Sequence, residues 1–197
     1  MINEKQDAAL YYIEHARRAL GHSQPRAALL LSEAVLTKEP LSLEALQIVR
    51  SCWKGCRISV FRRWQTKLLL HLSIHSPAEK RIRLIERQLL AGVQEPFVYQ
   101  ALADAAEQLR AWPMMRFSYE VLVDLEPQSI DYIYELARVC LRLEDVDATL
   151  RLVEEILAQA PAHLDAQALA REAAVFKAMR EPMSIPRGGR SRLTSCP

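Results

Sequence analysis

Glycine, cysteine and long apolar runs are scarce in this chain. Among its 197 residues there are five Gly and four Cys. A low glycine content combined with abundant Ala, Leu, Glu and Arg is typical of a helical protein. The cysteines, at 52, 56, 140 and 196, do not form the regular spacing of a disulfide framework. Their scatter favours a reducing compartment.

Uncharged stretches are too short for a membrane span, which requires roughly 20 apolar residues. The first ten residues, MINEKQDAAL, are charged and lack the apolar segment of a signal peptide. We therefore expect a soluble, cytoplasmic protein without a membrane partner. A chain of this length buries about 70% of its unfolded surface as a single domain, so its core needs no disulfides.

The few Gly and Pro residues fall between segments of helical periodicity. Apolar residues recur every three or four positions within each segment, as on one face of a helix. Pro suits the first turn of a helix and Gly the position after its end, so these residues mark joints. Up to residue 181 they are Gly21, Pro25, Pro40, Gly55, Pro77, Gly92, Pro96, Pro113, Pro127 and Pro161. A further joint is expected at 143–145. The sequence thus predicts an all-α fold of about ten helices, over 5–20, 24–38, 42–54, 57–75, 78–91, 96–110, 113–125, 129–142, 145–159 and 162–180.

Two neighbouring helix pairs repeat in the sequence. Pro127 and Pro161, which lie 34 residues apart, each follow one pair. Residue types in the two pairs match at this spacing, which indicates one structural unit used twice. The matches are Tyr99 with Ile133, Leu102 with Leu136, Ala103 with Ala137, Ala106 with Cys140, Trp112 with Val146, Tyr119 with Val153 and Leu122 with Ile156.

The segment PFVYQALADAAEQLRAWPMMRFSYEVLVDLEP resembles the tetratricopeptide repeat (TPR) family. It has a large residue near the start of the first helix, Leu followed by a small residue, aromatics in the second helix and Pro after its end, although Met115 stands where the family prefers Ala. The resemblance is clear over 96–161, weaker over 8–40 and irregular over 41–95. It implies antiparallel helix pairs stacked as a right-handed α-solenoid in a single domain over 1–180, with 162–180 as a capping helix. The remaining residues, 181–197, are expected to form a flexible basic tail.

Residues 41–95 fit the repeat least well. We expect a helix pair over 41–77 and then a single helix over 78–95 with no mate. In the second helix of the pair, one stripe at helical spacing carries Phe61, Trp64, Leu68, Leu72 and His75. Such a stripe predicts core residues, so the neighbouring Arg62, Arg63, Thr66 and Lys67 are expected to face water.

The stretch CWKGCRISVFRRWQTKLLLHLSIH has two Cys and two His, Cys52, Cys56, His71 and His75, at a spacing that suggests a zinc finger. A single Zn²⁺ requires all its ligands within about 2.0 to 2.3 Å. If 57–75 is one helix, Cys56 and His71 are separated by about 22 Å along its axis. We therefore expect no metal ion and no cofactor.

Charge is distributed in blocks along the chain. Residues 50–87 contain ten Lys or Arg against two Glu, whereas residues 95–181 contain eight basic against sixteen acidic residues. A basic surface is therefore expected, formed by Arg57, Arg62, Arg63, Lys67, Lys80, Arg83 and Arg87. Nucleic acid is one alternative partner, but aromatic residues on a core stripe leave no stacking platform for bases. Self-association through the oppositely charged regions is another.

Motifs of catalysis are missing: the sequence has no Gly-rich phosphate loop, no nucleophile elbow and no HExxH. We expect no enzyme. The resemblance implies instead an interaction scaffold or adaptor that binds a segment of another protein in a concave groove. Carried over from the two repeats, the groove residues are Phe97, Gln100, Asp104, Gln108, Asp131, Tyr134, Glu135, Arg138 and Arg142. A chaperone for a secreted client protein stays open as an alternative within the same class.

Overall fold

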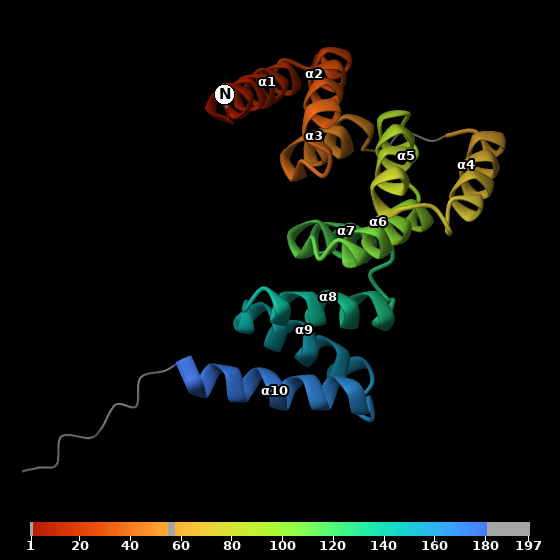
Figure 1. Cartoon of the computed structure of the whole chain (residues 1–197). Helices are drawn as coiled ribbons and strands as arrows, with labels where there is room; N and C mark the ends of the chain where they lie inside the picture. The colour runs from red at the N-terminus through yellow and green to blue at the C-terminus, as the bar shows by residue number, and fades with distance from the viewer. Residues whose placement is uncertain (1, 55–57, 181–197) are drawn as a thin grey trace, which may run out of the picture.

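Helices make up all the regular structure of the computed structural model, which describes residues 2–54 and 58–180 (Figure 1). They are α1 (Ile2–Gly21), α2 (Pro25–Lys38), α3 (Leu43–Trp53), α4 (Val60–Leu72), α5 (Ala78–Leu90), α6 (Pro96–Gln108), α7 (Trp112–Leu125), α8 (Ile130–Arg142), α9 (Val146–Gln159) and α10 (Leu164–Arg180). The expected all-α fold is confirmed. Every described helix end lies within three residues of its expected position.

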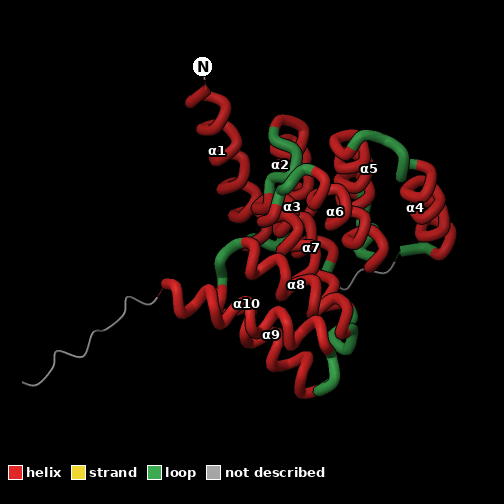
Figure 2. Tube along the Cα trace, turned by 60° about the horizontal axis from the view of Figure 1, so that its bottom comes forward, coloured by secondary structure: helices red, strands yellow, loops and turns green. Residues whose placement is uncertain are grey.

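The helices form an elongated stack, with α1 at one end and α10 at the other (Figures 1 and 2). From α5 onward each helix packs against the next one in the sequence. One buried cluster extends from α1 to α9, and a smaller one joins α8, α9 and α10. Large side chains such as Tyr99, Leu102 and Leu122 are almost fully buried. Burial of each such side chain stabilises the fold by about 1.5 to 3 kcal/mol.

The repeat predicted from the sequence is present in the backbone. Each bound of α6 and α7 shifts by 34 residues to the corresponding bound of α8 and α9, for example 96 to 130 and 112 to 146. The turns also correspond, because Arg110 and Glu144 have φ values of 54° and 60°. Thirteen of the fourteen matched side chains are buried, and Trp112 is half-buried. The pattern of matches therefore identified the core of this part of the stack.

The helix without a mate is α4, and not the helix over 78–95. Among the described residues, α4 packs against α5 and α6 and makes no contact with α3. Helix α3 packs mainly against α2 and also against α5, which itself contacts α2 and α6. Figures 1 and 2 show α4 at the outer edge of the molecule, beyond α5. The expected helix pair over 41–77 is therefore wrong, because α3 packs against α5 and makes no contact with α4, the next helix in the sequence.

The predicted orientation of α4 is also wrong. Phe61, Trp64 and Leu72 are exposed to 68%, 60% and 69%, whereas Thr66 is buried. Leu68 and His75, the other members of the expected core stripe, are exposed as well. The cause is the contact with α5, in which the Thr66 hydroxyl donates to the Gln88 side-chain oxygen at 2.9 Å. The opposite, apolar side of α4 consequently faces outward.

Candidate interaction surface

The outward face of α8 carries five of the predicted groove residues. Arg138 donates to both carboxylate oxygens of Glu135 at 2.8 Å, and Tyr134 stacks against His163 with the ring centroids 5.4 Å apart. Arg142 lies over the ring of Trp112, 5.9 Å from its centroid. The fifth residue, Asp131, is exposed in the first turn. The residues share this face because they recur at i, i+3, i+4 and i+7 along one helix.

The corresponding face of α6 carries the other four. Gln100, Asp104 and Gln108 are exposed, while Phe97 is half-buried and packs against the core. Surrounding protein atoms raise the pKa of the Asp104 carboxyl by excluding water from it. Arg81 on α5 opposes this shift by attraction. Phe97 therefore contributes mainly to the packing of the helices and is only partly accessible to a partner.

Tyr119 connects the two faces, although the sequence did not predict it as a site residue. It lies on α7, which packs against both α6 and α8. Burial raises the pKa of its phenol, and the nearby carboxylates of Glu135, Asp104 and Glu107 raise it further. Arg138 acts in the opposite direction. The phenol therefore lies in a predominantly acidic environment between α6 and α8.

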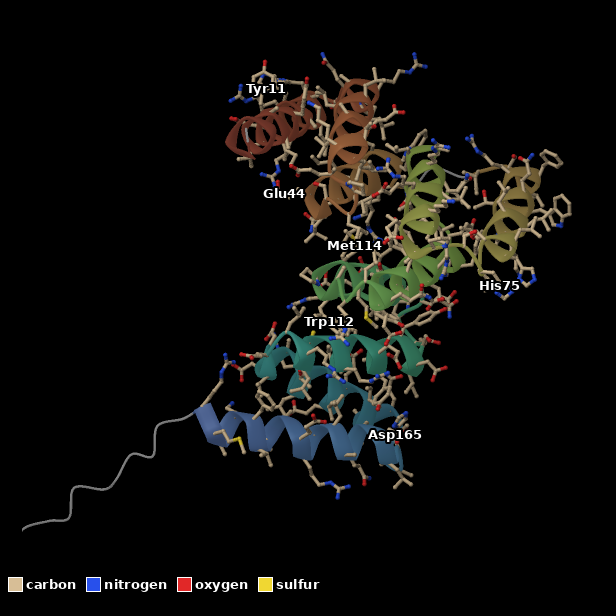
Figure 3. The ribbon with its side chains drawn as sticks, viewed as in Figure 1. Tyr11, Glu44, His75, Trp112, Met114 and Asp165 are labelled. Atoms are coloured by element: carbon tan, nitrogen blue, oxygen red, sulfur yellow. The ribbon has the colours of Figure 1, made fainter. Side chains whose placement is uncertain are left out.

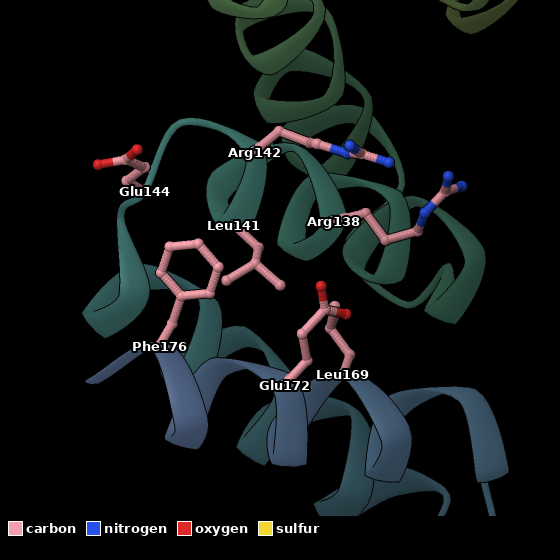
Figure 4. A pocket seen from close by; sticks show the side chains of 7 residues that line it. All are labelled: Arg138, Leu141, Arg142, Glu144, Leu169, Glu172 and Phe176. Carbon is pink, nitrogen blue, oxygen red and sulfur yellow. The ribbon is translucent and has the colours of Figure 1, made fainter. Parts of the chain in front are cut away.

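A pocket of about 290 Å³ lies between α8 and α10 (Figure 4). Its apolar residues are Leu141, Leu169 and Phe176, and its charged residues are Arg138, Arg142, Glu144 and Glu172. Figure 4 shows the arginines extending from α8 above the side chains of α10. Arg138 and Arg142 were predicted from the sequence as groove residues, whereas 162–180 was predicted only as a capping helix. The spacing of Leu169, Ala173 and Phe176 on one helical face is the signal that could have indicated a contribution from α10.

A larger cavity, of about 450 Å³, lies between α3, α6 and α7. Its central cation, Arg50, is bonded to Asp124 at 2.8 Å and lies 5.9 Å from the ring centroid of Tyr99. The pKa of Tyr99 is raised to about 12, chiefly by burial. Arg50 is already paired within the protein, whereas Lys54, which also lines this cavity, is exposed.

The predicted basic surface is divided in the structure. Arg62 and Lys67 are exposed on α4, and Arg63 pairs there with Glu95 at 3.1 Å. Lys80 is exposed in the first turn of α5. Arg83 and Arg87 line a different cavity, with Glu33, Leu36 and Thr37 of α2. Arg57 lies outside the described residues. The cations therefore do not form one continuous surface over the described part of α4 and α5.

The residues considered for zinc do not gather in the described part of the chain. His71 is exposed in the last turn of α4, and His75, labelled in Figure 3, follows that helix. Cys56 lies outside the described residues. Over residues 2–54 and 58–180, no three His, Cys, Asp or Glu side chains are placed to hold a metal ion. Within the same ranges, every helix is too short or too polar to cross a membrane.

Comparison with known proteins finds similarity to a solved structure and to no family model or curated protein. Among solved structures, the crystal structure of MamA protein aligns with 92% of this chain and 100% of its own, at 15% identity and a TM-score of 0.40. A superposition this loose carries no site or function to the present chain.

Proposed function

We propose that the protein is a non-enzymatic scaffold that binds a segment of another protein along α6, α8 and α10. The observation that carries the proposal is the pocket between α8 and α10, where apolar side chains lie beside charged ones. Binding sites for peptides commonly combine an apolar pocket with a few placed polar groups. The unit that binds would be the helical domain over 1–180.

The chemistry of this surface favours a particular kind of segment. Asp104 and Glu107 lie near Tyr119, so a basic side chain of the partner would be attracted there, whereas Glu135 is paired with Arg138. The pocket would accept an apolar side chain against Leu169 and Phe176. Arg142, exposed at the pocket, would pair with an acidic group. The expected ligand is therefore a polar segment of mixed charge with one apolar anchor.

The test is affinity capture from an extract of the source cells, using the full chain and variants of this surface. Arg138→Glu reverses the charge at the pocket, and Tyr134→Ala removes the ring that stacks on His163. Each is expected to lower the recovery of a specific partner about tenfold or more, as for the loss of a central interface residue. Circular dichroism would confirm that both variants remain folded.

Arg151→Glu is the matched control, because Arg151 is an exposed arginine on α9, beside a separate cavity that also involves Arg116 and Glu120. It should leave the partners unchanged. Equal recovery with all three variants would remove α8 as the binding surface. An adaptor should retain its partner in folded form, whereas a chaperone should bind the client only before the client folds.

A further inference from the structure

The exposed apolar side of α4 is unusual for a helix at the edge of a protein. Six of its thirteen residues are large apolar residues with substantial exposure: Val60, Phe61, Trp64, Leu68, Leu69 and Leu72. Phe61, Trp64, Leu68 and Leu72 recur at i, i+3, i+7 and i+11, so they form one stripe along the helix. The stripe lies opposite Thr66 and Leu70, the buried residues of the helix. It is therefore directed away from the rest of the protein.

Positive charge flanks this stripe, and α4 itself carries no acidic residue. Arg62 and Lys67 are exposed on either side of it. Residues 45–78 contain no Asp or Glu, and the one carboxylate paired with a described cation of α4 belongs to Glu95. An apolar stripe with Trp and Phe between basic residues is typical of a helix that lies in the interface of a membrane. The outer surface of α4 is thus complementary to an anionic, partly apolar surface.

The position of α4 favours a flat surface over a groove. The helix contacts only α5 and α6 among the described helices and lies at the edge of the molecule in both views (Figures 1 and 2). Its thirteen residues give a length of about 20 Å. A protruding helix of this length can lie flat on a bilayer without interference from the rest of the stack. No membrane span is needed for this mode of binding.

Other occupants fit this surface less well. In a symmetric contact between two copies, Arg62 and Lys67 of one α4 would approach those of the other without an intervening acid. Nucleic acid could stack on Phe61 and Trp64, but it would leave the other four exposed apolar residues, which are aliphatic, without a partner. We infer that α4 is a peripheral membrane-binding helix that docks the protein on anionic phospholipid through the stripe of Phe61, Trp64, Leu68 and Leu72. The expectation of no membrane partner rested on the absence of a span, which does not apply to such a helix.

The test is co-sedimentation of the full chain with large unilamellar vesicles. One set contains phosphatidylcholine alone, and the other also contains about one quarter phosphatidylserine. Binding is expected on the anionic vesicles, with a blue shift of tryptophan emission, and should weaken as salt is raised. Phe61→Ser with Trp64→Ser should reduce the partition coefficient at least tenfold. Arg62→Gln with Lys67→Gln should reduce it about tenfold on anionic vesicles.

Leu30→Ser is the matched control, since Leu30 is an equally exposed apolar residue on α2. All variants keep residues 181–197, so a difference between them reports on α4. Retention of full binding by the Phe61 and Trp64 variant would overturn the inference, as would the absence of binding to the anionic vesicles. Two further results would also overturn it: dissociation of a lipid-free oligomer by that variant, or salt-dependent retention of single-stranded DNA that the variant abolishes.

Discussion

Leu41 and Glu86 form a long-range contact that includes a titratable carboxyl group. Leu41 lies between α2 and α3 with φ of 67°, a left-handed conformation that costs a residue with a branched side chain about 1 to 2 kcal/mol. Its backbone N–H donates to the Glu86 carboxylate at 2.8 Å, across 45 residues of sequence. Glu86 is only 4% exposed. Burial raises its pKa to about 7, while the Leu41 N–H and Arg83 act against the shift.

This raised pKa predicts how stability depends on pH. The unfolded chain ionises Glu86 near pH 4.5, but the folded protein does so only near 7. The contribution of Glu86 to the free energy of unfolding is therefore most favourable below pH 4.5, and it is lost as the pH rises through 7. In Glu86→Gln, the fall in the free energy of unfolding between pH 5 and 8 should be smaller by about 1 to 3 kcal/mol. Urea unfolding of both proteins at several pH values measures this difference.

Glu79→Gln is the control for this experiment, because Glu79 is exposed on the same helix. It should leave the pH dependence unchanged. If Glu86→Gln and the native protein lose stability in parallel as pH rises, Glu86 is not the titrating group.

At the scale of the helix, sequence predicted where elements begin and end better than which side they bury. Pro and Gly affect the backbone locally, so the joints could be located without tertiary information. The joint at 143–145, which has neither residue, was also expected and lies between α8 and α9. The side that α4 buries depends instead on a bond between Thr66 and Gln88, 22 residues apart. An apolar stripe indicates which side favours burial, but not whether the same chain covers it.

The start of α9 offers a prediction at this scale. The Asp145 side chain accepts from the backbone N–H of Ala148 and also pairs with Arg116 at 2.9 Å. Asp145→Ala should lower the free energy of unfolding by about 1 to 2 kcal/mol, as for the loss of other N-cap residues. Ser129 caps α8 without a side-chain hydrogen bond, so Ser129→Ala should cost less than half as much. If denaturant titrations give the two variants equal losses in the free energy of unfolding, the hydrogen bond between the Ala148 N–H and Asp145 does not stabilise the start of α9.

For the whole molecule, the arrangement of contacts predicts an uneven distribution of local stability. Residues of α6 and α7 lie in the middle of the stack and contribute more to the larger buried cluster than any other two helices. By contrast, α4 buries only Thr66 and Leu70 and packs against two helices. Helices with few buried contacts open more often. Backbone amides of α4 should therefore exchange with deuterium faster than those of α3 and α5, which flank it in sequence.

Hydrogen exchange followed by mass spectrometry would measure this order in the lipid-free protein. Equal protection of α4 and α5 would contradict the arrangement described for α4. Slow exchange in α10 would likewise contradict its place at the end of the stack, where it packs mainly on α9.

The candidate site could be predicted from sequence only as far as the repeat extends. Arg138 and Arg142 were placed through the TPR resemblance, and both line the pocket. Tyr119 was only matched with Val153 in the repeat, and its proximity to carboxylates on two other helices depends on how α6, α7 and α8 pack. Leu169 and Phe176 belong to α10, which lies outside the two repeats that could be compared in the sequence.

The spacing of 34 residues has a consequence for the direction in which a segment could lie on this surface. Shifted by one repeat, the apolar pocket residues Leu141, Leu169 and Phe176 correspond to Glu107, Glu135 and Arg142. Equivalent places on successive repeats thus differ in chemistry, one charged and the next apolar. A ligand segment that binds at both places must present its basic residue toward α6 and its apolar residue toward α10. The same segment would fit poorly in the reverse direction. An array built from repeated units is in this way able to distinguish the N-to-C direction of its ligand.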